Sequence, residues 1–276
     1  MTMKRAIAGM VAAGMIVLTH AGTSAQTLVQ ESAEVDLELV LAVDVSYSMD
    51  IDEQREQRLG YAQAITSPEV LSAIQSGLTG RIAVSYMEWA GAYSQRTIVD
   101  WQIIEDAGSA KQFADRLMKA AQVRIFRTSI SEALVEAGRM IRDNRYEGLR
   151  KVIDVSGDGP NNQGRLVETA RKAILADGIT INGLPIMIKR PGVNWYDIPN
   201  LDEYYRRCVI GGPGAFIVPV RERSAFAQAI RQKLVLEIAG RSPLAPHVSP
   251  AQLIPREPLC TIGERLWQMR PDGLDF

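Results

Sequence analysis

Short oxygen-bearing side chains stand at alternate positions directly after the apolar run 37–43. They are Asp44, Ser46 and Ser48. Because alternate residues of an extended segment point the same way, the carboxylate and the two hydroxyls can converge on one point. Hard oxygen ligands of low total charge suit Mg²⁺ and similar divalent ions. The cluster therefore predicts part of a cation site, and its alternative interpretation is a helix-capping turn without an ion.

Two later segments are candidates to complete this site. Asp158 lies in a Gly-Asp-Gly segment after the expected strand 151–156, and Thr128 lies where a helix is expected to begin, as an N-cap would. Asp154, four residues earlier, is the alternative to Asp158. We choose Asp158 because it is followed by glycine at the strand end, whereas Asp154 is expected to be a satisfied polar residue inside the sheet.

The elements that must position these residues alternate between strand-like and helix-like patterns. Apolar runs predict strands at 37–43, 81–87, 151–156, 179–188 and 215–218, and apolar stripes predict helices over 52–65, 113–121, 130–141, 166–174 and 226–234. Alternation over 97–103 predicts an edge strand with one solvated face. We therefore expect an α/β fold, with a doubly wound, mostly parallel central sheet, one antiparallel edge strand and helices on both faces. Ligands of such sheets bind beyond the carboxyl ends of the strands.

The amino-terminal segment has the pattern of a secretory signal peptide. Lys4 and Arg5 precede the apolar stretch 6–18, and small residues lead to an expected cleavage site near Ala25. A membrane anchor is the alternative, although the apolar run is short for a span. No later stretch is long and apolar enough to cross a bilayer. We expect residues 1–25 to be removed and the mature chain to be soluble and periplasmic or secreted.

The carboxy-terminal segment changes in composition. Six prolines follow Arg241 and exclude a long regular element, so we expect a domain over 35–240 and a Pro-rich, extended tail over 241–276. Cys260 and Trp267 are its candidate anchors. In an oxidising compartment the two cysteines, Cys208 and Cys260, predict a disulfide, and the alternative is that they never meet.

Charge and histidine content exclude several classes of function. The formal net charge is −1 and no basic field is present, so nucleic acid is not an expected partner. The two histidines lie in the signal peptide and in the tail. No Gly-x-Ser-x-Gly motif and no cysteine nucleophile with a base are present, so we do not expect an enzyme.

Together, Asp-x-Ser-x-Ser, the later threonine and the Asp-Gly segment resemble the metal-ion-dependent adhesion site (MIDAS) of the von Willebrand factor A (VWA) domain. The resemblance covers about residues 35–240. More narrowly, the segments Met-Glu-Trp-Ala-Gly at 87–91 and Gly-Gly-Pro-Gly-Ala-Phe at 211–216 are similar to an uncharacterised family of exported bacterial proteins with this domain.

The resemblance implies a role for each predicted ligand. Ser46 and Ser48 would bind the metal through their hydroxyls, and Thr128 directly or through water. Asp44 and Asp158 would act mostly through bound waters. One position would stay open for an Asp or Glu of a partner protein. Mg²⁺ is the expected ion, with Mn²⁺ and Ca²⁺ as alternatives.

Two departures from the motif concern the later segments. Arg127 precedes Thr128 where small residues are usual, so that this cation either repels the metal or points outward and helps to hold an acidic partner. The third segment reads Gly-Asp-Gly in place of the commoner Thr-Asp-Gly.

The leading hypothesis is an exported, metal-dependent protein-binding module. One alternative is a Mg²⁺-dependent phosphatase with Asp44 as nucleophile, which is disfavoured because Ser46 occupies the place of its acid/base carboxylate. The other is a metal-free structural or interaction protein that acts through its tail.

Overall fold

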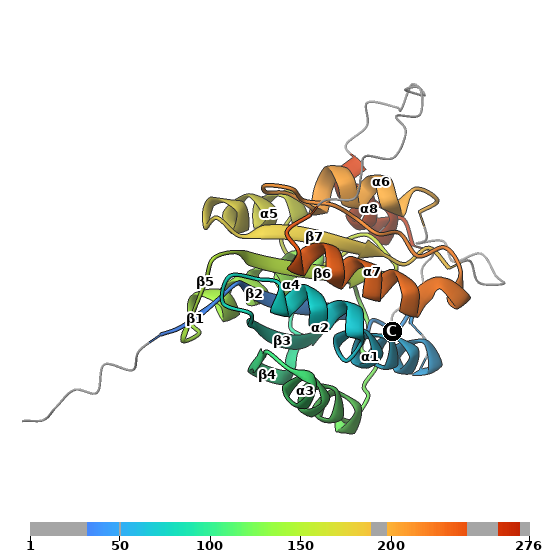
Figure 1. The fold of residues 1–276 in the computed structure, drawn as a ribbon. Coiled ribbons are helices and arrows are strands. Elements are labelled where there is room, and N and C mark those ends of the chain that lie inside the picture. Colours follow the sequence, from blue (N-terminus) through green and yellow to red (C-terminus); the bar gives the residue numbers. More distant parts are fainter. Residues whose placement is uncertain (1–31, 50, 189–197, 242–258, 271–276) are drawn as a thin grey trace, which may run out of the picture. The chain divides into compact units, whose positions relative to one another are not determined.

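The computed structural model of the protein describes residues 32–49, 51–188, 198–241 and 259–270 (Figure 1). The expected signal peptide lies outside these residues. Within them, the main sheet has five strands in the order β4-β3-β2-β6-β7. The bounds are β2 Leu37–Asp44, β3 Ile82–Trp89, β4 Gln95–Ile104, β6 Lys151–Gly157 and β7 Thr180–Pro185. A separate parallel pair is formed by β1 Ala33–Val35 and β5 Tyr146–Gly148.

Strand pairing confirms the expected sheet. β2 pairs in parallel with β3 and with β6, and β6 pairs in parallel with β7. β4 runs antiparallel to β3 at the edge. Within the main sheet, the chain passes first through the central strand β2, then outward through β3 and β4, and returns to the other side of β2 with β6. The strand order therefore reverses between β2 and β6, and the loops that follow these two strands lie at the same carboxyl edge.

Helices cover both faces of the main sheet because β2 is apolar on both. Leu39 and Leu41 of β2 join the core beneath one set of helices, whereas Val40 and Ala42 join the core on the other face. The first set is α1 Ile51–Ile65, α2 Pro68–Gln75, α3 Ala107–Lys119 and α7 Phe226–Ile238, which η2 Arg223–Ala225 precedes. The second set is α4 Ile130–Arg142, α5 Val167–Ala176, α6 Leu201–Tyr204 and the π-helical η1 Tyr205–Val209. None of the helices in the described ranges combines the length and the apolar character needed to span a bilayer.

The expected strand at 215–218 is wrong. This segment follows β7 only through isolated bridges, which pair Gly183 with Ile217 and Ile186 with Val220. Val218 and Val220 donate to the carbonyls of Gly183 and Pro185, but Pro185 of β7 has no N–H to donate to the carbonyl of Val218, so the ladder is interrupted between the two bridges.

The expectation that the carboxy-terminal tail is extended is wrong for residues 259–268. They form η3 Leu259–Thr261 and α8 Ile262–Gln268. The prolines of this region flank the helix at positions 255, 258 and 271, and leave a proline-free stretch between them. Cys260 is bonded to Cys208 of η1, with an S–S distance of 2.01 Å, which confirms the expected disulfide.

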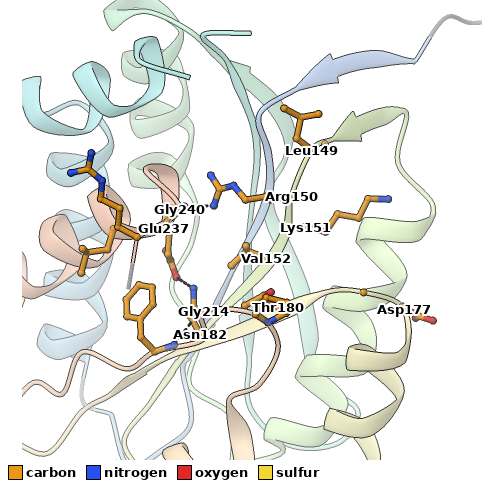
Figure 2. Close-up of a pocket in the computed structure, with 16 residues that line it drawn as sticks. Leu149, Arg150, Lys151, Val152, Asp177, Thr180, Asn182, Gly214, Glu237 and Gly240 are labelled. Atoms are coloured by element: carbon orange, nitrogen blue, oxygen red, sulfur yellow. Dashed lines mark hydrogen bonds between the residues drawn. The ribbon is translucent and has the colours of Figure 1, made fainter. Parts of the chain in front are cut away.

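A pocket of about 480 Å³ opens at the amino ends of β6 and β7, which is the sheet edge opposite to the predicted ligands (Figure 2). Lys151 and Thr180 line it where these strands begin, and Gly240 lines it after the end of α7. The guanidinium of Arg150 donates to the carbonyls of Glu237 and Ile238 at 2.6 Å each, and so caps the carboxyl end of α7. Arg150, a basic residue that lines this pocket, therefore holds α7 in place.

A buried charge cluster adjoins this pocket. Glu237 accepts hydrogen bonds from Nδ2 of Asn182 at 3.0 Å (Figure 2) and from Nζ of Lys233. Lys233 also pairs with Asp154, with 2.6 Å between Nζ and Oδ1, and all of these side chains are buried. Asp154 is thus paired with a cation inside the sheet, whereas its Oδ2 has no hydrogen-bond partner among the described residues. Burial first, and then the charge of Asp154, raise the pKa of Glu237 to about 7.

The raised pKa of Glu237 predicts a pH-dependent stability. Between its ordinary pKa of 4.5 and about 7, the native protein keeps a proton that the unfolded chain has released. The contribution of Glu237 to stability therefore falls as the pH rises through this window. Glu237→Gln cannot ionise. We expect its free energy of unfolding, relative to that of the wild type, to rise by about 1–3 kcal/mol from pH 5 to pH 8.

Urea denaturation at both pH values measures this difference. The exposed Glu222→Gln is the matched control and is expected to show no such trend. If the difference in the free energy of unfolding between the wild type and Glu237→Gln is the same at both pH values, Glu237 is ionised at both and the prediction is contradicted.

Candidate metal centre

The chain turns sharply where β2 ends. The backbone N–H of Ser46 donates to Oδ1 of Asp44 at 2.7 Å, and that of Met49 donates to the carbonyl of Ser46 at 2.9 Å. Such short side-chain-to-backbone bonds stabilise a tight turn. The turn brings the hydroxyls of Ser46 and Ser48 together, with 2.8 Å between their Oγ atoms. The expected convergence of alternate residues is therefore present.

The loop after β6 reaches the same place. Oγ of Ser48 donates to Oδ1 of Asp158 at 2.7 Å, across a sequence separation of 110 residues. Ser46, Ser48 and Asp158 thus form a continuous hydrogen-bonded chain, and Asp44 joins it through the backbone of Ser46. The structure brings four of the five predicted ligands into one connected group.

Thr128 lies in a third loop that is fastened to the other two. Its N–H donates to Oδ1 of Asn162 at 3.0 Å, and its carbonyl accepts from the N–H of Asn162 at 2.9 Å. Earlier in the same loop, Ile125 forms a β-bridge with Ser46. The expectation that Thr128 caps α4 is off by one residue, because Ser129 is the N-cap. The hydroxyl of Thr128 is therefore not used by the helix end.

The two carboxylates create an unfavourable concentration of negative charge. Asp44 is completely buried, and burial first, followed by the charge of Asp158, raises its pKa well above the ordinary value. Its Oδ1 accepts from Ser46, but its Oδ2 has no hydrogen-bond partner among the described residues. A buried carboxylate oxygen without a donor fits a site in which a metal-bound water supplies the donor.

Gly157 makes room for this arrangement. A Cβ atom at this position would lie 2.8 Å from Oδ2 of Asp44 and 2.9 Å from the hydroxyl of Tyr205. The Tyr205 hydroxyl is also buried without a hydrogen-bond partner in the described part of the chain. Burial and then the charge of Asp44 raise its pKa well above the ordinary value. No sequence motif indicated that Tyr205 would reach this loop, and Gly157 stood out only as part of the Gly-Asp-Gly segment.

A polar run after Asp158 connects the loops, and sequence reasoning missed it. Asn161 is fully buried, and its Oδ1 accepts from the N–H of Ser131 in α4 at 3.0 Å. Oε1 of Gln163 accepts from the N–H of Ala92 after β3 at 2.9 Å. The only sequence signal was the Asn-Asn-Gln run at 161–163 directly behind an Asp-Gly-Pro turn.

Exposed aromatic rings lie next to the hydroxyl turn. The rings of Tyr47 and Phe126 stack with centroids 4.3 Å apart, and they are 50% and 40% exposed. The guanidinium of Arg124 lies 4.0 Å from the centroid of the Tyr47 ring and donates to the Tyr47 carbonyl at 2.5 Å. Large apolar side chains held rigidly at the surface are typical of protein contacts.

The donor set is made of hydroxyls and carboxylates. In the ranges that the structure describes, no group of three or more His, Cys, Asp or Glu side chains is placed to chelate a metal. Two carboxylates with neutral hydroxyls are suited to a hard ion such as Mg²⁺ and not to a thiolate- or imidazole-bound metal.

Residues 34–242 match the family model described as "Protein of unknown function (DUF1194)". This match covers most of the chain, so the protein belongs to this family, as the sequence motifs indicated. No curated protein shows significant similarity.

Several solved structures have a similar fold. One is proximal thread matrix protein 1 (PTMP1) of the mussel byssus with a zinc-occupied MIDAS motif, with 14% identity, a TM-score of 0.50 and coverage of 74% of this chain and 46% of that chain. The pilus adhesin SpaC of Lactobacillus rhamnosus GG, in an open conformation, has 12% identity, a TM-score of 0.52 and coverage of 74% and 30%. A von Willebrand factor type A structure from Catenulispora acidiphila has 13% identity, a TM-score of 0.49 and coverage of 74% and 43%. This chain spans less than half the length of each of these proteins, and the likeness to PTMP1 and SpaC confirms the VWA-like fold.

The close contacts of Gly157 generate a stability prediction. Gly157→Ala forces its new methyl against Asp44 and Tyr205, so we expect it to lower the free energy of unfolding by about 1–3 kcal/mol. Gly159→Ala, two residues along the same loop, is the matched control, because its Cβ would meet nothing within 4 Å. Chemical denaturation compares the two variants, and equal stabilities would contradict the close packing at Gly157.

Proposed function

We propose that the protein is an exported, metal-dependent protein-binding module. Ser46, Ser48, Thr128, Asp44 and Asp158 hold a divalent cation at the carboxyl edge of the sheet, and one vertex of the ion stays open for an Asp or Glu of a partner. The observation that carries this proposal is the hydrogen-bonded chain from Ser46 through Ser48 to Asp158, beside the orphaned buried oxygen of Asp44.

The donor set explains how such an ion would bind a partner. Ser46 and Ser48 offer neutral hydroxyls, while Asp44 and Asp158 orient bound waters and balance the charge. Mg²⁺ keeps several waters and needs few anionic ligands, so it is the expected ion, with Mn²⁺ and Ca²⁺ as alternatives. An ion held mainly by neutral oxygens remains electrophilic, and an incoming carboxylate therefore gains a strong bond. The zinc-occupied MIDAS motif of PTMP1 supports a divalent cation in this type of fold.

The surface around the ion supports a protein partner. The exposed Tyr47–Phe126 stack offers an apolar contact beside the ligand turn, and Arg124 adds a cation next to it. A carboxylate with apolar neighbours matches this combination in charge and in polarity. The disulfide and the amino-terminal pattern support export to an oxidising compartment.

Removal of single ligands tests the metal assignment. We expect the wild type to bind Mg²⁺ or Mn²⁺ in titration calorimetry, and Ser46→Ala, Ser48→Ala and Asp158→Ala to lose measurable binding. Because these side chains lie outside the apolar core, we expect the melting temperature of the metal-free variants to stay close to that of the wild type. Asp115→Asn, an exposed carboxylate on α3, is the control and should bind the ion normally. Unchanged affinity in all three ligand variants would refute the site.

Capture from an envelope extract tests the function itself. We expect immobilised wild-type protein to retain a partner in the presence of Mg²⁺ and to release it when a chelator is added. The Ser48→Ala protein should retain none. If the partner is retained in the presence of the chelator and by the Ser48→Ala protein, metal-bridged binding is contradicted. Phosphatase turnover that is lost in Asp44→Asn would favour the hydrolase instead.

A further inference from the structure

The short carboxy-terminal helix α8 packs against the loops of the metal centre. The family match ends at residue 242, so α8 at Ile262–Gln268 lies beyond the matched region. Figure 1 shows it close to α6, on the side of the sheet that α5 also covers. Three kinds of contact fix its position: close backbone packing, a cation–π contact and the disulfide.

The amino-terminal turn of α8 contacts Asn161. A Cβ atom at Gly263 would lie 2.0 Å from the carbonyl oxygen of Asn161, so only glycine allows this approach. In the next position, Oε1 of Glu264 accepts from Nδ2 of Asn161 at 2.8 Å. Asn161 also bonds to α4 through Ser131 and lies next to Asn162, which holds both backbone groups of Thr128. The helix therefore presses on the residue that links the loops of Thr128 and Asp158.

The carboxy-terminal turn of α8 contacts Arg127. The guanidinium carbon of Arg127 lies 3.4 Å from the centroid of the Trp267 ring, which is cation–π geometry. Arg127 has a φ of 79°, a left-handed conformation that non-glycine residues rarely adopt. Trp267 thus holds a strained residue directly before Thr128. The sequence left open whether Arg127 repels the metal or points outward to an acidic partner. In the structure, its guanidinium lies over the ring of Trp267 in the carboxy-terminal tail.

The disulfide fastens α8 to a second support of the same site. Cys260 precedes α8, and Cys208 belongs to η1, which begins with Tyr205. The hydroxyl of Tyr205 lies beside Gly157, and the hydroxyl of the neighbouring Tyr204 accepts from the N–H of Asn161 at 3.1 Å. One covalent bond therefore joins α8, which contacts Asn161, to η1, whose first residue reaches the last residue of β6.

We propose that α8 and its disulfide form a brace that fixes the loops of Thr128 and Asp158 in the geometry that binds the metal. Trp267 and Glu264 are positioning residues in this account, and they act through Arg127 and Asn161. This inference rests on the proposed metal-binding function. It gives one cause to the arginine before Thr128 and to the helix that lies beyond the family match.

Mn²⁺ titration of the full oxidised chain tests the brace. We expect Trp267→Ala and Gly263→Ala to weaken Mn²⁺ binding by about tenfold, the range seen when groups that orient metal ligands are lost. Trp267→Phe keeps an aromatic face for Arg127 and should restore most of the affinity. Met269→Ala, an exposed position just after α8, is the matched control and should bind as the wild type does. The double variant Cys208→Ser, Cys260→Ser should also bind more weakly.

The outcomes separate the brace from the metal site itself. Wild-type Mn²⁺ affinity in both Trp267→Ala and Gly263→Ala would overturn the brace, even if their melting temperatures fall, because α8 would then be only structural. If the wild-type protein binds no Mn²⁺ at all, the metal assignment fails, and the brace fails with it. A selective loss of affinity that Trp267→Phe rescues supports the proposal.

Discussion

Two carboxylates from strands on either side of the strand-order reversal meet at one edge of the sheet. Asp44 ends β2 and Asp158 follows β6. Because these two strands pair in parallel, the two residues lie next to each other at the carboxyl edge of the sheet. Their mutual repulsion, added to the burial of Asp44, disfavours the charged state of that group. A divalent cation between them would turn this cost into attraction. The serine turn, the glycine at 157 and the Thr128 loop all make sense as parts arranged around that ion.

Two other buried acids of the protein have a cationic partner. Asp154 and Glu237 share the ammonium group of Lys233, and Arg150 caps the end of α7. A buried acid that has such a partner needs no ion. The contrast along β6 is informative: Asp154 in the middle of the strand has a cation from α7, while Asp158 beyond its end accepts from the Ser48 hydroxyl and lies near the carboxylate of Asp44. The structure thus separates a structural acid from a candidate functional one.

Local pattern and sheet topology made much of this predictable. The apolar run of β2 and the Asp-x-Ser-x-Ser spacing determine which oxygens can converge, and the alternation of strands and helices determines where Asp158 arrives. The alternating pattern at 97–103 correctly marked the antiparallel edge strand β4.

Features that depend on long-range packing were not predictable. Nothing local shows that Asn161 is buried beneath Gly263, that the Tyr205 hydroxyl reaches Gly157, or that Trp267 covers Arg127. The strand expected at 215–218 failed because Pro185 of β7 has no N–H to donate to this segment. The prolines of the tail conceal α8, because they indicate an extended segment although they only flank the helix.

The central claim is that an ion binds between the loops after β2 and β6. Anomalous X-ray scattering from a crystal of the protein grown with Mn²⁺ locates such an ion directly. The account predicts one strong peak at about 2 Å from the Ser46 and Ser48 hydroxyl oxygens, which is the distance of direct coordination by small divalent ions. The carboxylates of Asp44 and Asp158 should lie farther from the peak than this, because they act through metal-bound waters. A crystal in which the Mn²⁺ peaks lie elsewhere, and the Ser48 hydroxyl still donates to Asp158, would contradict it.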